Sequence, residues 1–313
     1  MRPYAFGVDI GGTTVKMGLF KTDGNLLETW EIVTRRESDG AYILEDIADA
    51  IKNKMEERGI FIADVEGMGI GVPGPVGPDG TVFKCVNLGW DVFNVELRMK
   101  ELTGLAVKAG NDANVAALGE MWQGGGKGCR DIVMVTLGTG VGGGVIADGK
   151  ILAGVNGAAG EIGHIPMYDD EPECCGCGKR GCLEQLASAN GIVRVTKRYL
   201  QSHPSVTSRL VGIEDFTAKD IFYAANNGDY VALKMVGETG RLLGKALASV
   251  ACVVNPEVFV IGGGMAKAGE MLVEAIRKNY RDYSFHASRE AKFELALLGN
   301  LAGIYGGVKM VLM

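Results

Sequence analysis

The spacing of apolar residues changes repeatedly along the 313-residue chain, and each change predicts a new strand or helix. Residues 4–10 and 15–20 read as two strands joined by a glycine and threonine turn at residues 11–14. The same order of strand, glycine turn and strand returns at residues 131–147. The pattern therefore predicts two halves that each begin with a hairpin.

Helical spacing of apolar residues predicts helices at residues 45–59, 112–123, 188–200, 217–227 and 230–254. Residues 65–77 read as a strand that enters a Gly/Pro loop, and residues 256–269 as a strand, a glycine turn and the start of a helix. Strands that alternate with helices indicate an α/β fold with largely buried sheets. A chain of this length is expected to form two domains.

Composition and charge narrow the class of protein. A hydrophobic fraction of 47% is enough to fill two cores, and a formal net charge of −6 argues against a surface that binds nucleic-acid phosphates. The N-terminal stretch lacks the features of a secretory signal, and no apolar run approaches the roughly eighteen residues of a membrane-spanning helix. We therefore expect a cytoplasmic protein with reduced cysteines, in which Cys85, Cys129 and Cys252 are buried.

Three glycine-rich turns, at residues 11–14, 138–143 and 262–264, offer bare backbone N–H groups to an anion. For any single turn, the need for a positive φ is the simpler explanation. Pairs of threonines accompany the first two turns and favour a nucleotide. The second turn also fits the dinucleotide pattern G-x-G-x-x-G, but a strand follows it where that pattern needs a helix, so a Rossmann site is excluded. The chain contains no P-loop motif.

Asp112 stands where a strand-like stretch meets the helix of residues 112–123. A carboxylate at this junction can cap the helix, with Asn111 as the other candidate cap, or it can accept a proton from a substrate hydroxyl. The spacing alone leaves these two roles balanced.

A loop at residues 161–185 concentrates groups that bind metals. The candidate ligands are His164, Cys175, Cys177 and Cys182. Three sulfurs and one nitrogen suit a tetrahedral zinc ion, which four protein ligands would make structural, and Cys174 is a spare candidate. Reduced, packed cysteines are the alternative, but the glycines between them leave little bulk to pack against. Glu161 and Glu184 flank the cluster and can accept hydrogen bonds from sugar hydroxyls, unless they are solvated surface charges.

Taken together, these motifs make the sequence similar to the ROK family of sugar kinases and, within it, to the bacterial glucokinases. The resemblance covers nearly the whole chain and rests on DIGGTTVKMGLF, GVPGPV, VNLGW, NDANVAALGEMW, VTLGTGVGGG, GEIGHI, CGCGKRGCLE and NPEVFVIGGG. It implies a two-domain actin-like, hexokinase-like (ribonuclease H-like) α/β fold with the active site in the interdomain cleft. We expect a smaller domain of residues 1–120 and 301–313, and a larger domain of residues 121–300 that carries the zinc loop.

The resemblance also implies roles for individual residues, with Asp112 as the catalytic base. The implied sugar contacts are Gly74, Asn87, Asn111, Asp112, Glu161, His164 and Glu184. The implied contacts of the nucleotide and its magnesium are Asp9, Gly11, Gly12, Thr13, Thr14, Lys16, Thr139, Gly140, Gly142, Gly143, Gly262, Gly263 and Gly264. His164 would serve both the zinc ion and a sugar hydroxyl, one with each ring nitrogen.

The implied activity is transfer of the γ-phosphoryl group of ATP, bound with Mg²⁺, to the C6 hydroxyl of glucose by a homodimer or larger homo-oligomer. A kinase for mannose, fructose or an N-acetylhexosamine is an alternative, as is a sugar sensor without catalysis, and polyphosphate is an alternative donor. A sugar-responsive repressor of the family would carry an additional N-terminal DNA-binding segment, whereas the first strand here is expected by residue 4. We expect neither nucleic acid nor a membrane as a partner.

Overall fold

The computed structural model describes residues 2–313 and divides into two compact units of mixed α/β structure. The first unit contains the residues up to Arg130, Gly144–Gly160 and Leu297–Met313. The second unit contains Asp131–Gly143 and Glu161–Ala296. This division differs from the expected boundaries because residues 121–130, 144–160 and 297–300 group with the first unit. Within residues 2–313, no helix is both long and apolar enough to cross a bilayer.

The first unit is built on a five-stranded sheet of order β3-β2-β1-β4-β7. The strands are β1 (Tyr4–Ile10), β2 (Thr14–Lys21), β3 (Leu26–Val33), β4 (Val65–Val72) and β7 (Val107–Asn111). β2 pairs antiparallel with both β1 and β3, which confirms the expected first hairpin. β4 and β7 extend the sheet in parallel from β1.

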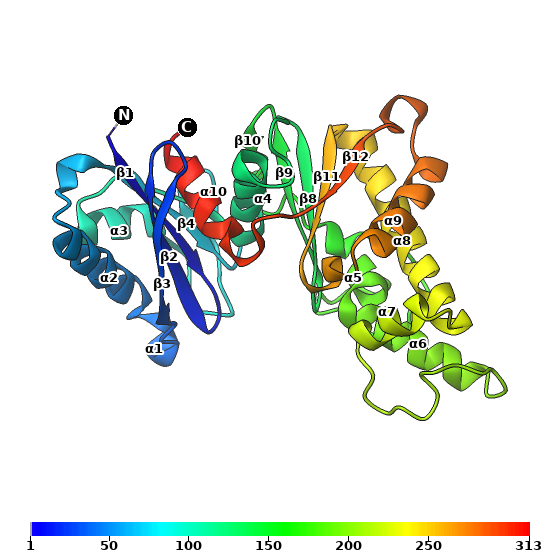
Figure 1. Cartoon of the computed structure of the whole chain (residues 1–313). Helices are drawn as coiled ribbons and strands as arrows, with labels where there is room; N and C mark the ends of the chain where they lie inside the picture. The colour runs from blue at the N-terminus through cyan, green and yellow to red at the C-terminus, as the bar shows by residue number, and fades with distance from the viewer. Residues whose placement is uncertain (1) are drawn as a thin grey trace. The chain divides into compact units, whose positions relative to one another are not determined.

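Helices cover both faces of this sheet, with α2 and α3 on one side and α10 on the other (Figure 1). The helices are α1 (Glu37–Gly40), α2 (Ile43–Arg58), α3 (Val95–Thr103), α4 (Asp112–Gln123) and α10 (Ala302–Val311). The short elements are η1 (Ile62–Asp64), β5 (Thr81–Val82), β6 (Phe93–Asn94), β10 (Lys150–Ile151) and η5 (Gly299–Leu301). A large apolar core lies under α2 and α3, and Phe20 and Ile304 belong to a smaller core that α10 closes.

Glycine lets α10 lie directly on the sheet. A Cβ atom on Gly69 of β4 would overlap the carbonyl group of Gly307, and one on Gly7 of β1 would overlap the carbonyl group of Ile304. Interiors are close-packed, so a side chain at either strand position would push the helix away. α10 also meets α4 at close range, where Gly306 lies against the backbone of α4. This helix therefore joins β1, β4 and α4 into one unit.

The second unit carries strands of another five-stranded sheet, of order β10-β9-β8-β11-β12. The strands not yet given are β8 (Ile132–Leu137), β9 (Val141–Ala147), β11 (Val258–Gly262) and β12 (Lys292–Leu295). β11 lies between β8 and β12 and is parallel to both. Phe259 of β11 stacks on Phe293 of β12, and Tyr280 packs edge-on against Phe259 while its hydroxyl donates to the Ser288 carbonyl at 2.6 Å.

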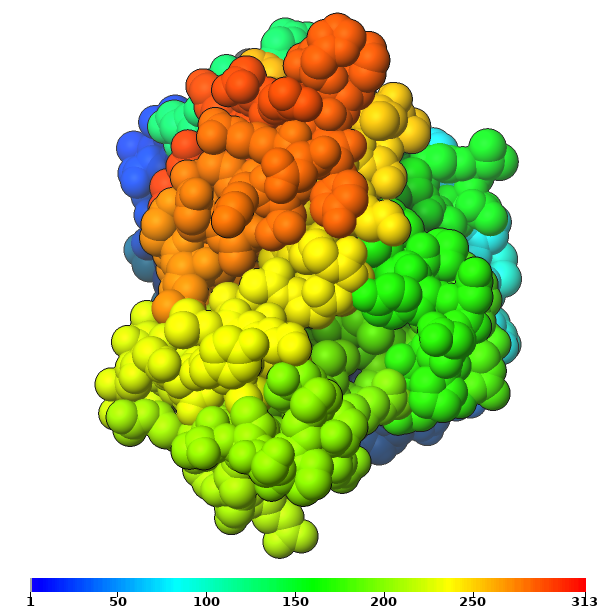
Figure 2. All heavy atoms as spheres, turned by 90° about the vertical axis from the view of Figure 1, so that its right-hand side faces the viewer, coloured from blue at the N-terminus to red at the C-terminus, as the bar shows by residue number. Residues whose placement is uncertain are grey.

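Helices form most of the rest of the second unit. They are α5 (Leu183–Ala187), α6 (Ala189–Ser202), α7 (Ala218–Asn226), α8 (Tyr230–Val254) and α9 (Glu270–Tyr283), with the 3₁₀ turns η2 (Ile162–His164), η3 (Gly264–Ala268) and η4 (His286–Ser288). Figure 2 looks onto the side of this unit where α6 to α9 run from green to orange. The expected helices at residues 112–123 and 230–254 are confirmed with the same bounds as α4 and α8.

Candidate active site

The turn between β1 and β2 presents exposed backbone. Thr34 holds it from outside, because its hydroxyl donates to the Gly11 carbonyl at 2.7 Å and its N–H donates to the Thr13 carbonyl at 2.9 Å. Gly12 and Thr13 are exposed, and both line a cavity of about 600 Å³ together with Asn87. The turn is thus open to a ligand, and the structure places Asn87 beside it.

Asp9 lies one residue before the end of β1, where two glycines make room for its carboxylate. A Cβ atom on Gly303 would stand 2.5 Å from Asp9 Cγ, and one on Gly71 would stand 3.3 Å from Asp9 Oδ1. Burial, followed by the negative charge of Asp112, raises the pKa of Asp9 to about 6, while Lys16 acts in the opposite direction. A divalent cation would reduce the repulsion between two such nearby carboxylates.

Thr14 and Lys16 follow on β2. Thr14 is exposed at the start of the strand. The ammonium group of Lys16 lies 3.3 Å from the Asn300 carbonyl oxygen and 3.4 Å from a carboxylate oxygen of Glu31. In this structure Lys16 is therefore held by groups of its own unit.

Asp112 and Asn111 meet at the junction of β7 and α4, where the sequence left two roles open. Asn111 is the helix cap, because its Oδ1 accepts from the N–H groups of Ala113 at 3.0 Å and Asn114 at 3.2 Å. Its amide nitrogen donates to Asp112 Oδ1 at 3.0 Å and to the Gly74 carbonyl at 3.2 Å. Ala113 N–H also donates to Asp112 Oδ1 at 2.8 Å. Asn111 thus caps the helix and aims the neighbouring carboxylate, which a proton acceptor needs.

The four expected metal ligands come together in the second unit. Their ligand atoms all lie within 4.8 Å of one another. Cys175 Sγ is 3.6 Å from His164 Nδ1, and Cys177 Sγ is 3.6 Å from Cys182 Sγ. Tetrahedral zinc with Zn–S of about 2.3 Å and Zn–N of about 2.0–2.1 Å sets neighbouring ligand atoms about 3.6–3.8 Å apart. The cluster fits such an ion, and we call residues 164–182 the metal loop.

The thiols of the metal loop differ in acidity. Burial raises the pKa of Cys175 to about 12 and also raises the pKa of Cys182. A hydrogen bond from the Lys179 backbone lowers the pKa of Cys177. A thiolate is the form that binds a metal, so a bound cation is what would keep the two buried sulfurs ionised.

Glu161 and Glu184 both face His164, from opposite sides of its ring. Glu161 Oε2 is 3.9 Å from His164 Nε2, whereas Glu184 Oε1 is 3.7 Å from His164 Nδ1 and 3.1 Å from Cys175 Sγ. Nδ1 is therefore the nitrogen turned to the cluster, and Nε2 is the one turned away. Gly140 packs against the same group, because a Cβ atom there would stand 2.7 Å from Glu184 Oε2.

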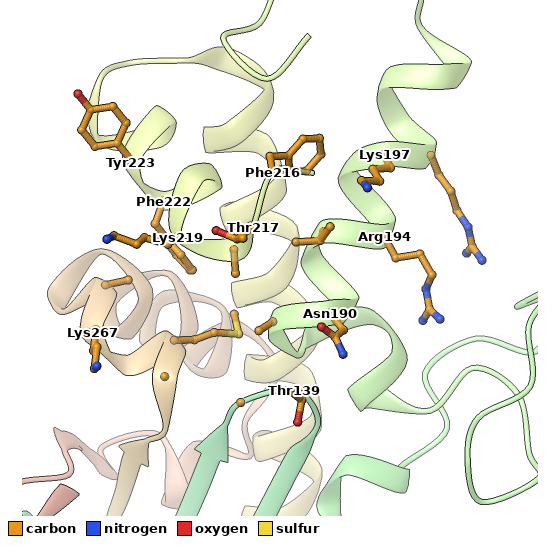
Figure 3. A pocket seen from close by; sticks show the side chains of 18 of the residues that line it. Thr139, Asn190, Arg194, Lys197, Phe216, Thr217, Lys219, Phe222, Tyr223 and Lys267 are labelled. Atoms are coloured by element: carbon orange, nitrogen blue, oxygen red, sulfur yellow. The ribbon is translucent and has the colours of Figure 1, made fainter. Parts of the chain in front are cut away.

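A cavity of about 1120 Å³, the α6–α7 cavity, opens beside the second glycine turn. It is lined by Gly138 and Thr139 of that turn, by Gly264 and Lys267 of η3, and by side chains of α6 and α7. Figure 3 shows Asn190, Arg194 and Lys197 on one helix, and Thr217, Lys219 and Phe222 on the segment across from it. Lys197 also lies 5.6 Å above the ring of Phe216. These cationic and aromatic groups suit a ligand that carries both an anion and a flat ring.

Some expected nucleotide residues do not line this cavity. Gly142 and Gly143 lie in β9, and a Cβ atom on Gly142 would stand 2.5 Å from Thr136 Oγ1. Gly262 ends β11, and Gly263 (φ 84°) packs closely on the backbone of Leu137. Of the second and third glycine turns, Gly138, Thr139 and Gly264 line the cavity itself.

The sequence did not point to the α6 and α7 side chains as part of a site. The only local signal was the run of basic residues at Arg194, Lys197 and Arg198, whose helical spacing places them on one face. A charged helical face is more often solvated, and the cavity exists only because α7 and the preceding segment pack opposite α6.

Comparison with known proteins points to one family. A sequence model of the ROK family matches residues 5–313. A glucokinase from Halalkalibacterium halodurans is 44% identical over 307 residues, which are 96% of this chain and 92% of that protein. A glucokinase from Streptomyces coelicolor is 36% identical over 312 residues, which are 97% of this chain and 96% of that protein. A solved structure of a ROK family glucokinase from Streptomyces griseus, in complex with glucose and AMPPNP, is 35% identical with a TM-score of 0.74, covering 97% of this chain and 98% of that one.

Proposed function

The chain belongs to the ROK family, and on that premise we propose that it is a glucokinase, which transfers the γ-phosphoryl group of ATP to the C6 hydroxyl of glucose. The observation that carries the proposal is the carboxylate of Asp112 at the end of β7, with Oδ1 held by the Asn111 amide and the Ala113 N–H. A carboxylate fixed at a strand end is placed to take a proton from a hydroxyl group.

Asp112 acts as the general base. As the C6 oxygen forms its bond to the γ-phosphorus, the bond from that phosphorus to the β,γ-bridging oxygen breaks, the hydroxyl proton passes to Asp112 and ADP leaves. The two donors on Oδ1 hold the carboxylate in one orientation, so little reorganisation is needed when the substrate binds. Most of the acceleration comes from positioning and from charge neutralisation.

Asp9 is the residue that would face the magnesium ion of the nucleotide. Its buried carboxylate, with a pKa of about 6, is ionised at neutral pH at a cost that a cation offsets. Magnesium would supply neutralisation of the phosphate charge. Gly12 and Thr13 belong to the same unit as Asp9, and their exposed backbone N–H groups are expected to bind the phosphates of the nucleotide.

His164 of the metal loop and the two carboxylates that flank this loop, Glu161 and Glu184, supply sugar contacts beside Gly74, Asn87 and Asn111. With zinc on Nδ1, His164 keeps Nε2 for a sugar hydroxyl, and Glu161 lies beside that nitrogen. Glu184 and Glu161 accept hydrogen bonds from further hydroxyls. His164, Cys175, Cys177 and Cys182 would fill all four positions of a bound zinc ion, which would fix the loop and leave the transfer to other groups.

The α6–α7 cavity holds the nucleoside and phosphates of ATP. Its volume of about 1120 Å³ is ample for a nucleotide, and Arg194, Lys197, Lys219 and Lys267 line it with positive charge. Thr139 borders the cavity where the second glycine turn would meet the phosphates. We further expect the protein to be cytoplasmic and to form a homodimer or larger homo-oligomer. Light scattering after gel filtration would measure the oligomeric state.

A coupled ADP-release assay tests this function. The protein, loaded with zinc, is given magnesium-ATP and glucose, mannose, fructose, N-acetylglucosamine or N-acetylmannosamine in turn. A clear preference for glucose is the expected result. Activity only with another sugar would keep the assignment of a kinase with Asp112 as its base but change the assigned substrate. If none of the sugars leads to ADP release, the proposed catalysis is refuted. Polyphosphate in place of ATP completes the panel.

A further inference from the structure

One helix of the second unit, α6, takes part in two sites. Asn190, Arg194 and Lys197 line the α6–α7 cavity (Figure 3). Arg194 and Arg198 of the same helix bind the acidic residues that precede the metal-binding cysteines. Ion pairs therefore connect the segment that precedes the metal-binding cysteines to a wall of the cavity.

The strongest of these contacts joins Arg198 to Glu171. Two bonds connect the guanidinium and carboxylate groups, Nη1 to Oε2 at 3.0 Å and Nη2 to Oε1 at 2.8 Å. Glu171 is 5% exposed, and Arg198 holds the pKa of its carboxyl below the usual range. A buried carboxylate that loses such a partner is left uncompensated, which makes the pair costly to break. Glu173 adds a second acid, bound by Arg198 and by Arg194 at 3.0 Å.

Gln185 extends this connection to a metal ligand. Its amide nitrogen donates to the Glu173 carbonyl at 3.1 Å, and its amide oxygen accepts from the Cys182 N–H at 3.1 Å. Arg194 donates to the Gln185 carbonyl. A continuous set of hydrogen bonds thus runs from Cys182 to the side chain that borders the cavity.

The metal loop has a separate anchor on α8. The hydroxyl of Tyr168 donates to Glu238 at 2.9 Å, and Arg241 binds both the Tyr168 hydroxyl and the Glu238 carboxylate, each at 2.6 Å. None of these three residues lines the α6–α7 cavity. The two anchors hold the same loop, but only the one on α6 reaches the expected nucleotide site.

We propose that the metal loop is energetically coupled to nucleotide binding through α6, with Glu171 and Glu173 as positioning residues. The inference rests on the proposed function, because it takes the α6–α7 cavity as the site of ATP and ADP. An ordered metal loop keeps both carboxylates in place, and these hold Arg194 and Arg198 so that the cavity wall is formed before the nucleotide arrives. Coupling between two sites is reciprocal, so the nucleotide must strengthen zinc binding by the same factor.

The first experiment compares the two anchors. The dissociation constant of magnesium-ADP is measured by calorimetry for the zinc-loaded wild type, Glu171→Gln and Glu238→Gln. Glu171→Gln should raise it about tenfold, while Glu238→Gln should change it by less than twofold. Equal effects of the two variants, or no effect of Glu171→Gln, would overturn the coupling through α6.

Glu173→Gln covers the case in which Glu171→Gln does not fold, since Glu173 is half-exposed and the Arg198–Glu171 pair remains. Its expected effect is about threefold weaker ADP binding. Glu173 itself lines the cavity, so if it acted only as a negative charge near the phosphates, its removal would tighten ADP binding. Tighter or unchanged binding in this variant therefore refutes a positioning role.

The second experiment tests reciprocity. Removal of zinc from the wild type should weaken ADP binding, and saturating ADP should raise the zinc affinity, measured against a competing chelator, by the same factor. Both effects should be smaller in Glu171→Gln. If saturating ADP leaves the zinc affinity of the wild type unchanged although the wild type binds ADP, the coupling is refuted. A wild type that binds no ADP would refute the proposed function, and the inference with it.

Discussion

Replacing Glu120 would test how the first unit is held together. The side chain is fully buried near the end of α4, and its carboxylate accepts three backbone hydrogen bonds. The donors are the N–H groups of Gly125 at 2.8 Å, Leu297 at 3.0 Å and Leu298 at 2.8 Å. The last two belong to the segment by which the chain returns to the first unit. One carboxylate thus ties α4 to that returning segment.

The expected magnitude follows from these three bonds. Hydrogen bonds to a charged group contribute roughly 1.5–3 kcal/mol each, and the donors here are only partly buried, so the lower end gives about 4.5 kcal/mol for Glu120→Ala. Glutamine can place its carbonyl oxygen at the Oε2 position and keep the bonds from Gly125 and Leu297. Its NH₂ group then faces the Leu298 N–H, so about 1.5 kcal/mol should be lost.

Thermal unfolding followed by calorimetry measures both variants. At about 2–4 °C per kcal/mol, typical of about 150–250 residues, the midpoint should fall by about 9–18 °C for Glu120→Ala and about 3–6 °C for Glu120→Gln. Glu101→Gln is the control, because its side chain is 68% exposed and meets Arg98 only at 3.5 Å. Equal losses in both Glu120 variants, or a loss in Glu120→Ala no larger than in the control, would refute the reasoning.

The remaining predictions concern the site. Asp112→Asn should lower kcat by roughly 10²–10⁴-fold while the dissociation constant of glucose stays within about threefold, and unchanged turnover would contradict the assignment of the base. Cys177→Ser should lower both zinc content, measured by atomic absorption, and glucose affinity; zinc loss with intact affinity would separate the metal from the sugar contacts. Gly140→Ala should weaken glucose binding, because its methyl group would stand 2.7 Å from Glu184 Oε2. Gly138→Ala is the control, because its added carbon meets nothing within 4 Å. If Gly140→Ala and Gly138→Ala bind glucose equally well, Glu184 does not contact the sugar. Burial raises the pKa of Asp9 from 3.8 to about 6, so the wild type without magnesium loses stability, up to about 3 kcal/mol, as pH rises through this range. Asp9→Asn stays neutral, and its gain in thermal midpoint over the wild type should be larger at pH 7.5 than at pH 5; a gain independent of pH would contradict the raised pKa.

The features that the sequence predicted well are local ones. α4 and α8 have the expected bounds because their caps and apolar stripes lie within a few turns, with Asn111 capping α4 and Asp229 capping α8. The metal cluster is a similar case, since its four ligands fall within about twenty residues and their types suit one ion. Short-range patterns of this kind need no knowledge of the fold.

The features that the sequence missed depend on contacts between distant segments. The α6–α7 cavity needs Thr217 and Phe222 to pack across from Lys197, and no local pattern shows that pairing. Gly142 resembles a turn residue in the sequence but lies in β9, where it packs on β8. The expectation of buried cysteines is confirmed for Cys85, but Cys129 is only half-buried and Cys252 is exposed on α8. An apolar neighbourhood in sequence does not say which face of a helix is covered.

The seating of α10 on Gly7 and Gly69 has a consequence for synthesis of the protein on the ribosome. The first unit needs α10 to cover Phe20 and one face of its sheet, yet α10 is translated after every other helix and strand of residues 2–313. The second unit consists of residues 131–143 and 161–296, so all of its segments are translated before α10. β1 and β2 are translated well before α10, so part of their apolar surface stays open to solvent or to a chaperone until α10 has been made.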